Sequence, residues 1–364
     1  MKNQIISLAL VAGLAACSGG NPFDEPVTPD PDVPDGEVIG DGEGTGINRD
    51  GIPPGTASPS PGESLFRSEP TVDGDGADAG NGFATGISYN SADDTFSVDN
   101  LAFDGDAPYN RGTIVSSLNT NADGNGEFAV YEGLETAVDP VNNDEIRQFV
   151  YRAVYGQSRN SFTDSDGTVR PTTQFAIVRT GSYVNYGFGG FIYQRDTSVS
   201  LPNTLQATFR GKSAGLRDFE NAGGLQYTTG DVTLDIDFDD FNDGATIRGD
   251  GVKGTVSNRR IIDLDGNDVT SRVANELGED VTAIPNAVFV VGPDVLDNNG
   301  DIITEIQSQF STGGVYETGT FYAIVSGENP DEVVGVFVLE SENTETISRD
   351  TSGFIVYRDV PTRP

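Results

Sequence analysis

Apolar residues in this chain come in short runs that are broken by glycine and proline. The 364 residues include 46 glycines and 19 prolines. The clearest run is 231–238, where Val232, Leu234 and Ile236 alternate with aspartate and threonine. An alternation of period two gives a strand one buried face and one solvated face. Many short strands joined by tight turns are therefore expected, and we predict an all-β protein.

The same pattern predicts two sets of strands. The first set comprises residues 83–89, 95–103, 128–131, 146–155, 174–179 and 188–194. The second comprises 204–213, 231–238, 246–257, 287–291, 302–310, 316–325, 333–339 and 353–357, with one plausible helical turn at 269–277.

The second set contains eight strands, which can close into a small antiparallel β-barrel filled by its own side chains. Glycines inside these strands, such as Gly211, Gly254 and Gly335, suit the bends that closure requires. A membrane-spanning barrel is the alternative. Charged residues on the outer face of 231–238 favour a soluble barrel.

Missing residue types exclude many kinds of site. The sequence has no histidine, no tryptophan and one cysteine, Cys17. A Ser-His-Asp triad, a Cys-His pair, an intrachain disulfide and the usual zinc, haem and iron–sulfur ligand sets therefore cannot form. A net charge of −36, from 57 acidic and 21 basic residues, would repel nucleic acid. We expect no cofactor, no metal centre, no catalytic residues and no nucleic-acid partner.

The first 16 residues are typical of a secretory signal peptide. Lys2 precedes an apolar stretch, residues 5–12, that is too short to span a bilayer. The four residues that end at Cys17 (LAAC) resemble the lipobox of bacterial lipoproteins, which implies that Cys17 becomes the lipid-modified N-terminal residue. Ser18, in place of aspartate, implies a lipid anchor in the outer membrane, at the cell surface or on the periplasmic face. A buried or free thiol is the alternative.

Composition divides the remaining chain into segments. Residues 17–81 are dense in proline, glycine, aspartate and glutamate. Such a segment cannot bury enough apolar surface to offset its loss of conformational entropy. We predict a disordered tether over 17–81, a smaller β-rich domain over 82–200, the barrel over 201–358 and a tail over 359–364.

Glycine-punctuated segments of the second strand set carry a family resemblance. Residues 207–215 (ATFRGKSAG), 227–238 (YTTGDVTLDIDF), 252–258 (VKGTVSN), 319–322 (GTFY) and 332–337 (EVVGVF) resemble the β-barrel domain of the transferrin-binding protein B family. Ala323 in place of glycine, a longer insert before Glu332 and one barrel rather than two lobes are departures.

The resemblance implies a handle domain beside the barrel, which residues 82–200 would form. It also implies a surface lipoprotein that captures host or environmental proteins, sometimes for iron supply. The transferrin-contacting residues of that family have no matching motif here, so the ligand-binding residues are unknown.

Three acidic loops could bind calcium. Asn119, Asn121, Asp123 and Gly124 match the start of an EF-hand loop, but Val130 occupies the position that needs a bidentate glutamate. Residues 263–268 (DLDGND) and 297–301 (DNNGD) also gather oxygen ligands. Because Asp-Gly and Asn-Gly between apolar runs are the usual hairpin signal, we favour turns.

Three other groups have a functional and a structural interpretation. The pairs Asp93-Asp94 and Asp239-Asp240 could support acid–base catalysis, although such pairs arise by chance among so many acidic residues. Arg259-Arg260 could hold an anion or an acidic partner, and a solvated loop is the favoured alternative. An aromatic patch could anchor a protein partner, and burial in a core is the favoured alternative. The patch comprises Tyr183, Tyr186, Phe188, Phe191 and Tyr193.

Together these features predict a non-catalytic, outer-membrane-anchored lipoprotein. It would act as a binding module for an extracellular protein or metal-carrying ligand, transferrin-like or another metal carrier. The alternative is a structural or adhesive envelope lipoprotein without a soluble ligand. A carboxylate-dependent hydrolase is a third and more distant hypothesis.

Overall fold

The structure is a computed structural model, and it describes only part of the chain. The described residues are 47–49, 65–68, 84, 86–99, 101, 108–120, 126–139, 141–147, 149–181, 186–202, 206–238, 251–278, 281–291, 295–297, 299–342 and 344–359. The predicted signal peptide (1–16), Cys17 and Ser18 lie outside them. The strands described below all lie in one compact unit, residues 36–364.

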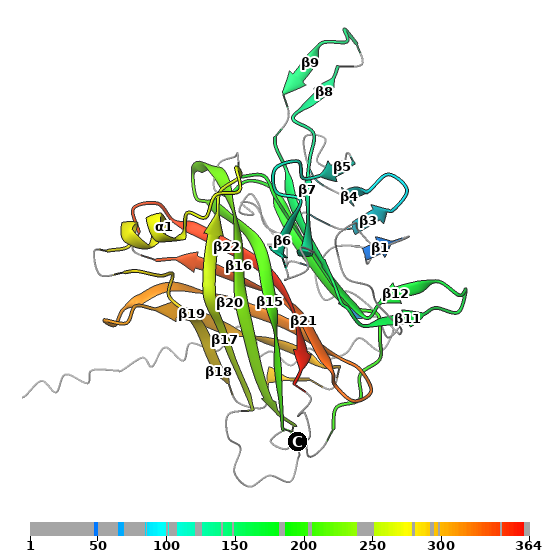
Figure 1. Cartoon of the computed structure of the whole chain (residues 1–364), viewed down its shortest axis with the longest axis vertical. Helices are drawn as coiled ribbons and strands as arrows, with labels where there is room; N and C mark the ends of the chain where they lie inside the picture. The colour runs from blue at the N-terminus through cyan, green and yellow to red at the C-terminus, as the bar shows by residue number, and fades with distance from the viewer. Residues whose placement is uncertain are drawn as a thin grey trace, which may run out of the picture. The chain divides into compact units, whose positions relative to one another are not determined.

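The C-terminal region is a closed antiparallel barrel of eight strands (Figure 1), as predicted. Its strands follow one another around the barrel in chain order, and β22 pairs with β15 to close it. A single helix, α1 (Thr270–Glu276), follows β17 and matches the predicted helical turn. The strands are β15 (Gln206–Phe219), β16 (Ala222–Asp237), β17 (Val252–Ile262), β18 (Ala287–Val291), β19 (Asp301–Gln309), β20 (Val315–Ser326), β21 (Glu332–Ser341) and β22 (Ser348–Arg358).

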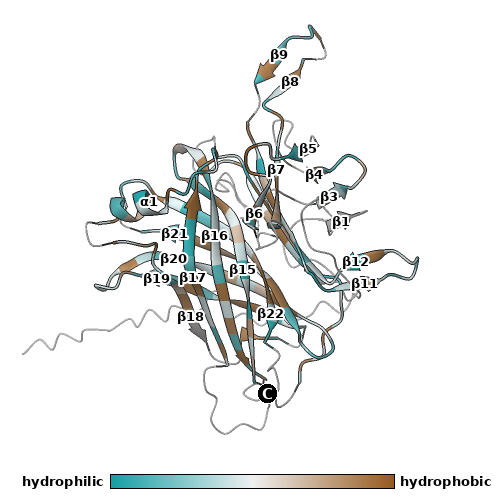
Figure 2. Cartoon of the chain, viewed as in Figure 1, coloured by the Kyte–Doolittle hydropathy of each residue, from teal (hydrophilic) through white to brown (hydrophobic). Residues whose placement is uncertain are grey.

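Alternation of residue types explains why the barrel is filled. On β16, Val232, Leu234 and Ile236 are at most 2% exposed and belong to the interior apolar cluster. The residues between them are partly or fully exposed, and Figure 2 shows hydropathy changing along the barrel strands. Phe321 and Phe354 stack at 4.9 Å inside the same cluster. The expected plug of side chains is therefore confirmed.

A second, open sheet precedes the barrel. Its ten strands are β1 (Ile47–Arg49), β2 (Leu65–Ser68), β3 (Gly86–Asn90), β4 (Thr95–Asp99), β5 (Tyr109–Arg111), β6 (Ser117–Thr120), β7 (Gly126–Glu132), β10 (Arg152–Gln157), β13 (Thr173–Arg179) and β14 (Gly189–Arg195). Two separate ribbons accompany it: β8 (Thr136–Val138) with β9 (Glu145–Arg147), and β11 (Ser161–Thr163) with β12 (Val169–Pro171). We call the open sheet and its ribbons the handle.

Two predictions for this region were wrong. Residues 47–49 and 65–68 were assigned to a disordered tether, but β1 pairs with β3 and β2 pairs with β14. The short pairings join these segments to a sheet that is otherwise formed by residues beyond 85. Residues 146–155 were predicted as one strand, yet β9 pairs only with β8 while β10 lies between β7 and β13.

The handle sheet packs one face against the barrel. On β13, Phe175 and Ile177 join a cluster that includes Leu216 and Ile355 of the barrel, whereas Ala176 and Val178 face the second core of the handle. A side chain at Gly353 of β22 would meet the ring of Phe175 at 2.1 Å, so glycine permits this close approach. Among the described residues, no helix has the length and apolar character needed to cross a membrane.

Candidate functional site

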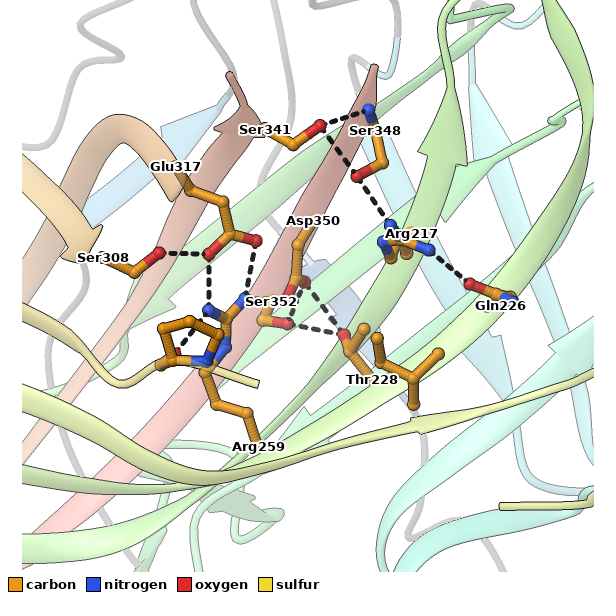
Figure 3. Close-up of polar contacts among 12 residues, drawn as sticks. Arg217, Gln226, Thr228, Arg259, Ser308, Glu317, Ser341, Ser348, Asp350 and Ser352 are labelled. Atoms are coloured by element: carbon orange, nitrogen blue, oxygen red, sulfur yellow. Dashed lines mark hydrogen bonds and ion pairs between the residues drawn. The ribbon is translucent and has the colours of Figure 1, made fainter. Parts of the chain in front are cut away.

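A polar layer occupies one part of the barrel interior (Figure 3). Arg259 donates two hydrogen bonds to Glu317, at 2.5 and 3.0 Å, and a third to Asp350 at 3.1 Å. All three residues are less than 8% exposed. Burial alone would lower the pKa of Arg259, but the two carboxylates offset this effect and raise it, so the guanidinium stays charged.

A β-bulge turns Arg259 inward. Asn258 has φ of 49°, and the register between β16 and β17 shifts at this point, between Thr229 and Asp231. An extra residue in one strand reverses which side chains face the interior. Both sequence interpretations of Arg259 were therefore wrong, because it lies on a strand and holds internal carboxylates. Arg260 points the other way and pairs with exposed Asp268 at 3.0 Å.

The rest of the layer satisfies its own hydrogen bonds. Arg217 donates to Gln226 at 2.6 Å and to Ser348 at 2.8 Å, and Thr228 donates to Asp350 at 2.9 Å. The two arginines balance the two carboxylates in charge. We interpret this layer as a structural plug, because its charged side chains are paired within the barrel.

Two of the three acidic loops, at 263–268 and 297–301, form turns where they are described, as favoured. The Asp263 carboxylate accepts hydrogen bonds from the backbone and side chain of Asn267, and Gly266 has φ of 83°. Asp297 accepts from the backbone N–H groups of Asn299 and Asp301 in the same way. In the third loop, Asn119 donates to the Ser213 carbonyl at 2.8 Å, and residues 121–125 lie outside the described residues. Within the described part of the chain, no group of three or more carboxylate or thiol side chains is placed to hold a metal ion.

Asp94 of the first carboxylate pair and part of the aromatic patch have structural roles. Asp94 accepts a hydrogen bond from the Tyr131 hydroxyl at 2.9 Å and lies 3.7 Å from Arg111. Phe191 and Tyr193 are buried, at 1% and 2% exposure, which confirms burial for these two residues. Phe188 and Tyr186 are half-buried. Tyr183, Asp239 and Asp240 lie outside the described residues.

One buried carboxyl at the contact between handle and barrel differs from those inside the barrel. Glu332, at the start of β21, accepts hydrogen bonds from Ser158 and, at 2.9 Å, from Asn160, which precede the β11–β12 ribbon. Its second oxygen, Oε1, has no hydrogen-bond partner among the residues that the structure describes. Burial raises the pKa of Glu332 to about 7, and nearby Asp331 adds to this effect.

The β8–β9 hairpin and the residue just before it carry four of the eight exposed large apolar side chains in the described part of the chain, including the most exposed one, Val141; Ile114 and Val169 are exposed elsewhere. Val141 is 89% exposed, Val138 62%, Ile146 47% and, just before β8, Leu134 is 44% exposed. Figure 1 shows this ribbon extending beyond the handle sheet. Its turn is ordered by the Asp139 carboxylate, which accepts from the Val141 N–H at 2.8 Å, and by Asn142, whose side-chain oxygen accepts from the Asp144 N–H at 2.9 Å.

The hairpin was not among the predicted sites. Asp139, Pro140, Asn142, Asn143 and Asp144 are a cluster of turn-forming residues, and such a cluster would have located the hairpin turn. Exposed apolar side chains gathered on one element mark protein-contact surfaces. The hairpin is therefore the candidate functional site.

Comparisons with known proteins give only distant similarities. No family model matches the sequence, and no curated protein matches it. Among solved structures, the chain is similar to a double mutant of the vaccine antigen Transferrin Binding Protein B from Haemophilus parasuis Hp5, with 10% identity and a TM-score of 0.35. That match covers 80% of this chain and 47% of the other, so this chain corresponds to about half of the antigen's length.

Two further structures are similar at the same level. The isotype 1 Transferrin binding protein B from serogroup B Neisseria meningitidis has 15% identity and a TM-score of 0.30, covering 60% of this chain and 35% of the other. A protein described as a surface lipoprotein has 10% identity and a TM-score of 0.27, covering 64% and 99%. Membership of the transferrin-binding protein B family stays a prediction from the sequence motifs.

Proposed function

We propose that this protein is a non-catalytic binding module that docks an extracellular protein through the β8–β9 hairpin. The observation that carries the proposal is the exposure of Val138, Val141 and Ile146 on a ribbon that pairs with no other described strand. Exposure of apolar side chains to water is unfavourable, and the free energy of the complex falls when a partner covers them. The buried charges of the barrel offer no comparable binding surface.

The lipobox-like sequence at Cys17 supports an anchored location for this module. On this proposal Cys17 carries the lipid, the outer membrane holds the protein, and the hairpin meets its partner outside the membrane. A transferrin-like protein or another metal carrier is one class of partner that the sequence resemblance suggests.

Site-specific photo-crosslinking in intact cells tests the proposal. A photoreactive residue at Val141 should crosslink to one defined protein, and the same residue at Val288 of the barrel, itself 39% exposed, should not. The partner identified by the crosslink is then purified, and its affinity for this protein is measured by calorimetry. Val141→Asp should lower that affinity, and Val288→Asp should leave it unchanged. Absence of any crosslink at Val141, or binding that survives Val141→Asp, would overturn the proposal in favour of a structural envelope role.

A further inference from the structure

The two faces of the β8–β9 hairpin differ in charge. The register pairs Ala137 with Ile146 and Val138 with Glu145. The Asp139 N–H donates to the Asp144 carbonyl at 2.9 Å, which continues the ladder by one more pair. Because neighbouring residues of a strand point to opposite faces, Asp139 and Asp144 share a face with Ala137 and Ile146. We call this the acidic face.

The opposite face of the hairpin is balanced in charge. It carries Val138 and Glu145 as one pair and Thr136 and Arg147 as the next. We call it the mixed face. Each face thus presents one large exposed apolar side chain, Ile146 or Val138, but the acidic face adds two negative charges and the mixed face adds none in sum.

The paired aspartates weaken the hairpin on its own. Like charges directly opposite each other in an antiparallel pair are destabilising. The Asp139 carboxylate orders the turn by accepting from the Val141 N–H, whereas the Asp144 carboxylate makes no hydrogen bond or ion pair with the described residues. Turn formation therefore accounts for Asp139 and leaves the carboxylate of Asp144 without a structural role.

We propose that the acidic face is the docking face, and that its partner is a protein surface with an apolar contact for Ile146 bordered by lysine or arginine side chains. Such a surface would bury Ile146 and neutralise Asp139 and Asp144 together. Complementary charge around an apolar contact provides both orientation and a faster encounter. This inference rests on the proposed function, since it names the chemistry of the partner for the same hairpin.

The test uses the full chain and three synthetic peptides of equal length. One alternates arginine with valine, one alternates glutamate with valine, and one alternates arginine with serine. Affinities are measured by calorimetry for the unaltered protein and for Asp144→Lys and Glu145→Lys. These two variants change the net charge by the same amount at adjacent exposed positions on opposite faces. They therefore separate the acidic face from the overall negative charge of the chain.

We expect the arginine–valine peptide to bind most tightly. Asp144→Lys should lower the affinity for this peptide by about fivefold to tenfold, and Glu145→Lys should lower it by less than about twofold. Ile146→Ser should lower the affinity for the arginine–valine peptide and leave the affinity for the arginine–serine peptide unchanged. Equal effects of Asp144→Lys and Glu145→Lys, or equal binding of the glutamate–valine peptide, would overturn the inference. A specific crosslink at Val141 combined with either of those results would retain the proposed function and reject only the basic partner.

Discussion

The barrel interior and the β8–β9 hairpin use charge in opposite ways. Inside the barrel, Arg259 holds Glu317 and Asp350 within 3.1 Å. On the hairpin, Asp139 and Asp144 lie opposite each other without a basic residue on their face. A buried charge needs a partner in its own chain, while a solvated charge can remain available to another molecule. The unmatched charges of the hairpin therefore agree with the proposed place of partner binding.

The largest effect on stability is expected from removing Arg259, the cation of the buried ion pairs in the barrel. Arg259→Met should lower the free energy of unfolding by about 3–5 kcal/mol, because Glu317 and Asp350 would remain buried without the guanidinium that bonds to both. Arg260→Met is the matched control, since its exposed pair with Asp268 should contribute less than about 1 kcal/mol. Urea denaturation measures both. Equal losses of unfolding free energy in the two variants would show that the buried ion pairs of Arg259 contribute no more than the exposed pair of Arg260.

The contact between handle and barrel includes one very close approach, of the Phe175 ring to Gly353. Phe175→Ala should cost about 3 kcal/mol through lost burial and the remaining cavity. Gly353→Ala should be strongly destabilising in the unaltered protein, where its Cβ would lie 2.1 Å from the ring, and much less so together with Phe175→Ala. A double-mutant cycle measures this coupling. Additive effects would contradict direct packing.

Glu332 differs from Glu317 and Asp350 because it is a buried carboxyl whose hydrogen-bond donors, Ser158 and Asn160, are neutral. Its pKa rises from the usual 4.5 to about 7, so the folded state binds a proton more tightly than the unfolded state. Stability should therefore fall as pH rises from about 4.5 to 7, and the loss is complete above pH 7. Between pH 5 and 8 this group should account for about 2 kcal/mol.

Glu332→Gln provides the control for that pH dependence. Glutamine keeps a neutral group against Ser158 and Asn160, so the difference in stability between pH 5 and 8 should shrink by the same amount. Denaturation of both proteins across this range measures the change. An unchanged pH dependence would show that Glu332 ionises freely in the folded protein.

The smallest effect on stability is expected at the hairpin. Val141→Ser should change the free energy of unfolding by less than about 0.5 kcal/mol, because the side chain is already 89% exposed. The same variant should weaken partner binding, which separates stability from function. A loss of stability above 1 kcal/mol would mean that Val141 belongs to the fold rather than to a contact surface.

Alternation of residue types made most of the barrel predictable. Residues 287–291 were assigned with the bounds that β18 has, and Val232, Leu234 and Ile236 point inward as expected. Several predicted strands were too short at the end that carries the polar layer. Ser348 and Asp350 face the interior there, and a pattern based on hydrophobicity cannot recognise a buried polar residue whose partners are distant in sequence.

The bulge at Asn258 and the charge of the hairpin faces were not predictable in the same way. The bulge turns the Arg259 side chain to the interior of the barrel. Asn258 tolerates the positive φ that the bulge needs, but asparagine is too common in turns for this residue alone to locate the bulge. The faces of β8 and β9 become visible only when the register is known. Both features depend on which residues oppose each other across strands, which is information that one segment of sequence does not contain.

Pairing between β15 and β22 has a consequence for the newly made chain. The register joins Phe209 to Arg358 and Phe219 to Ser348, so the cylinder shuts only when its first strand meets its last. During synthesis, one edge of β15 stays unpaired until more than a hundred further residues have emerged. A chain that ends before residue 348 would lack β22, so β15 and β21 would each keep an unpaired strand edge that can aggregate. Such a product should be a target for proteases and chaperones.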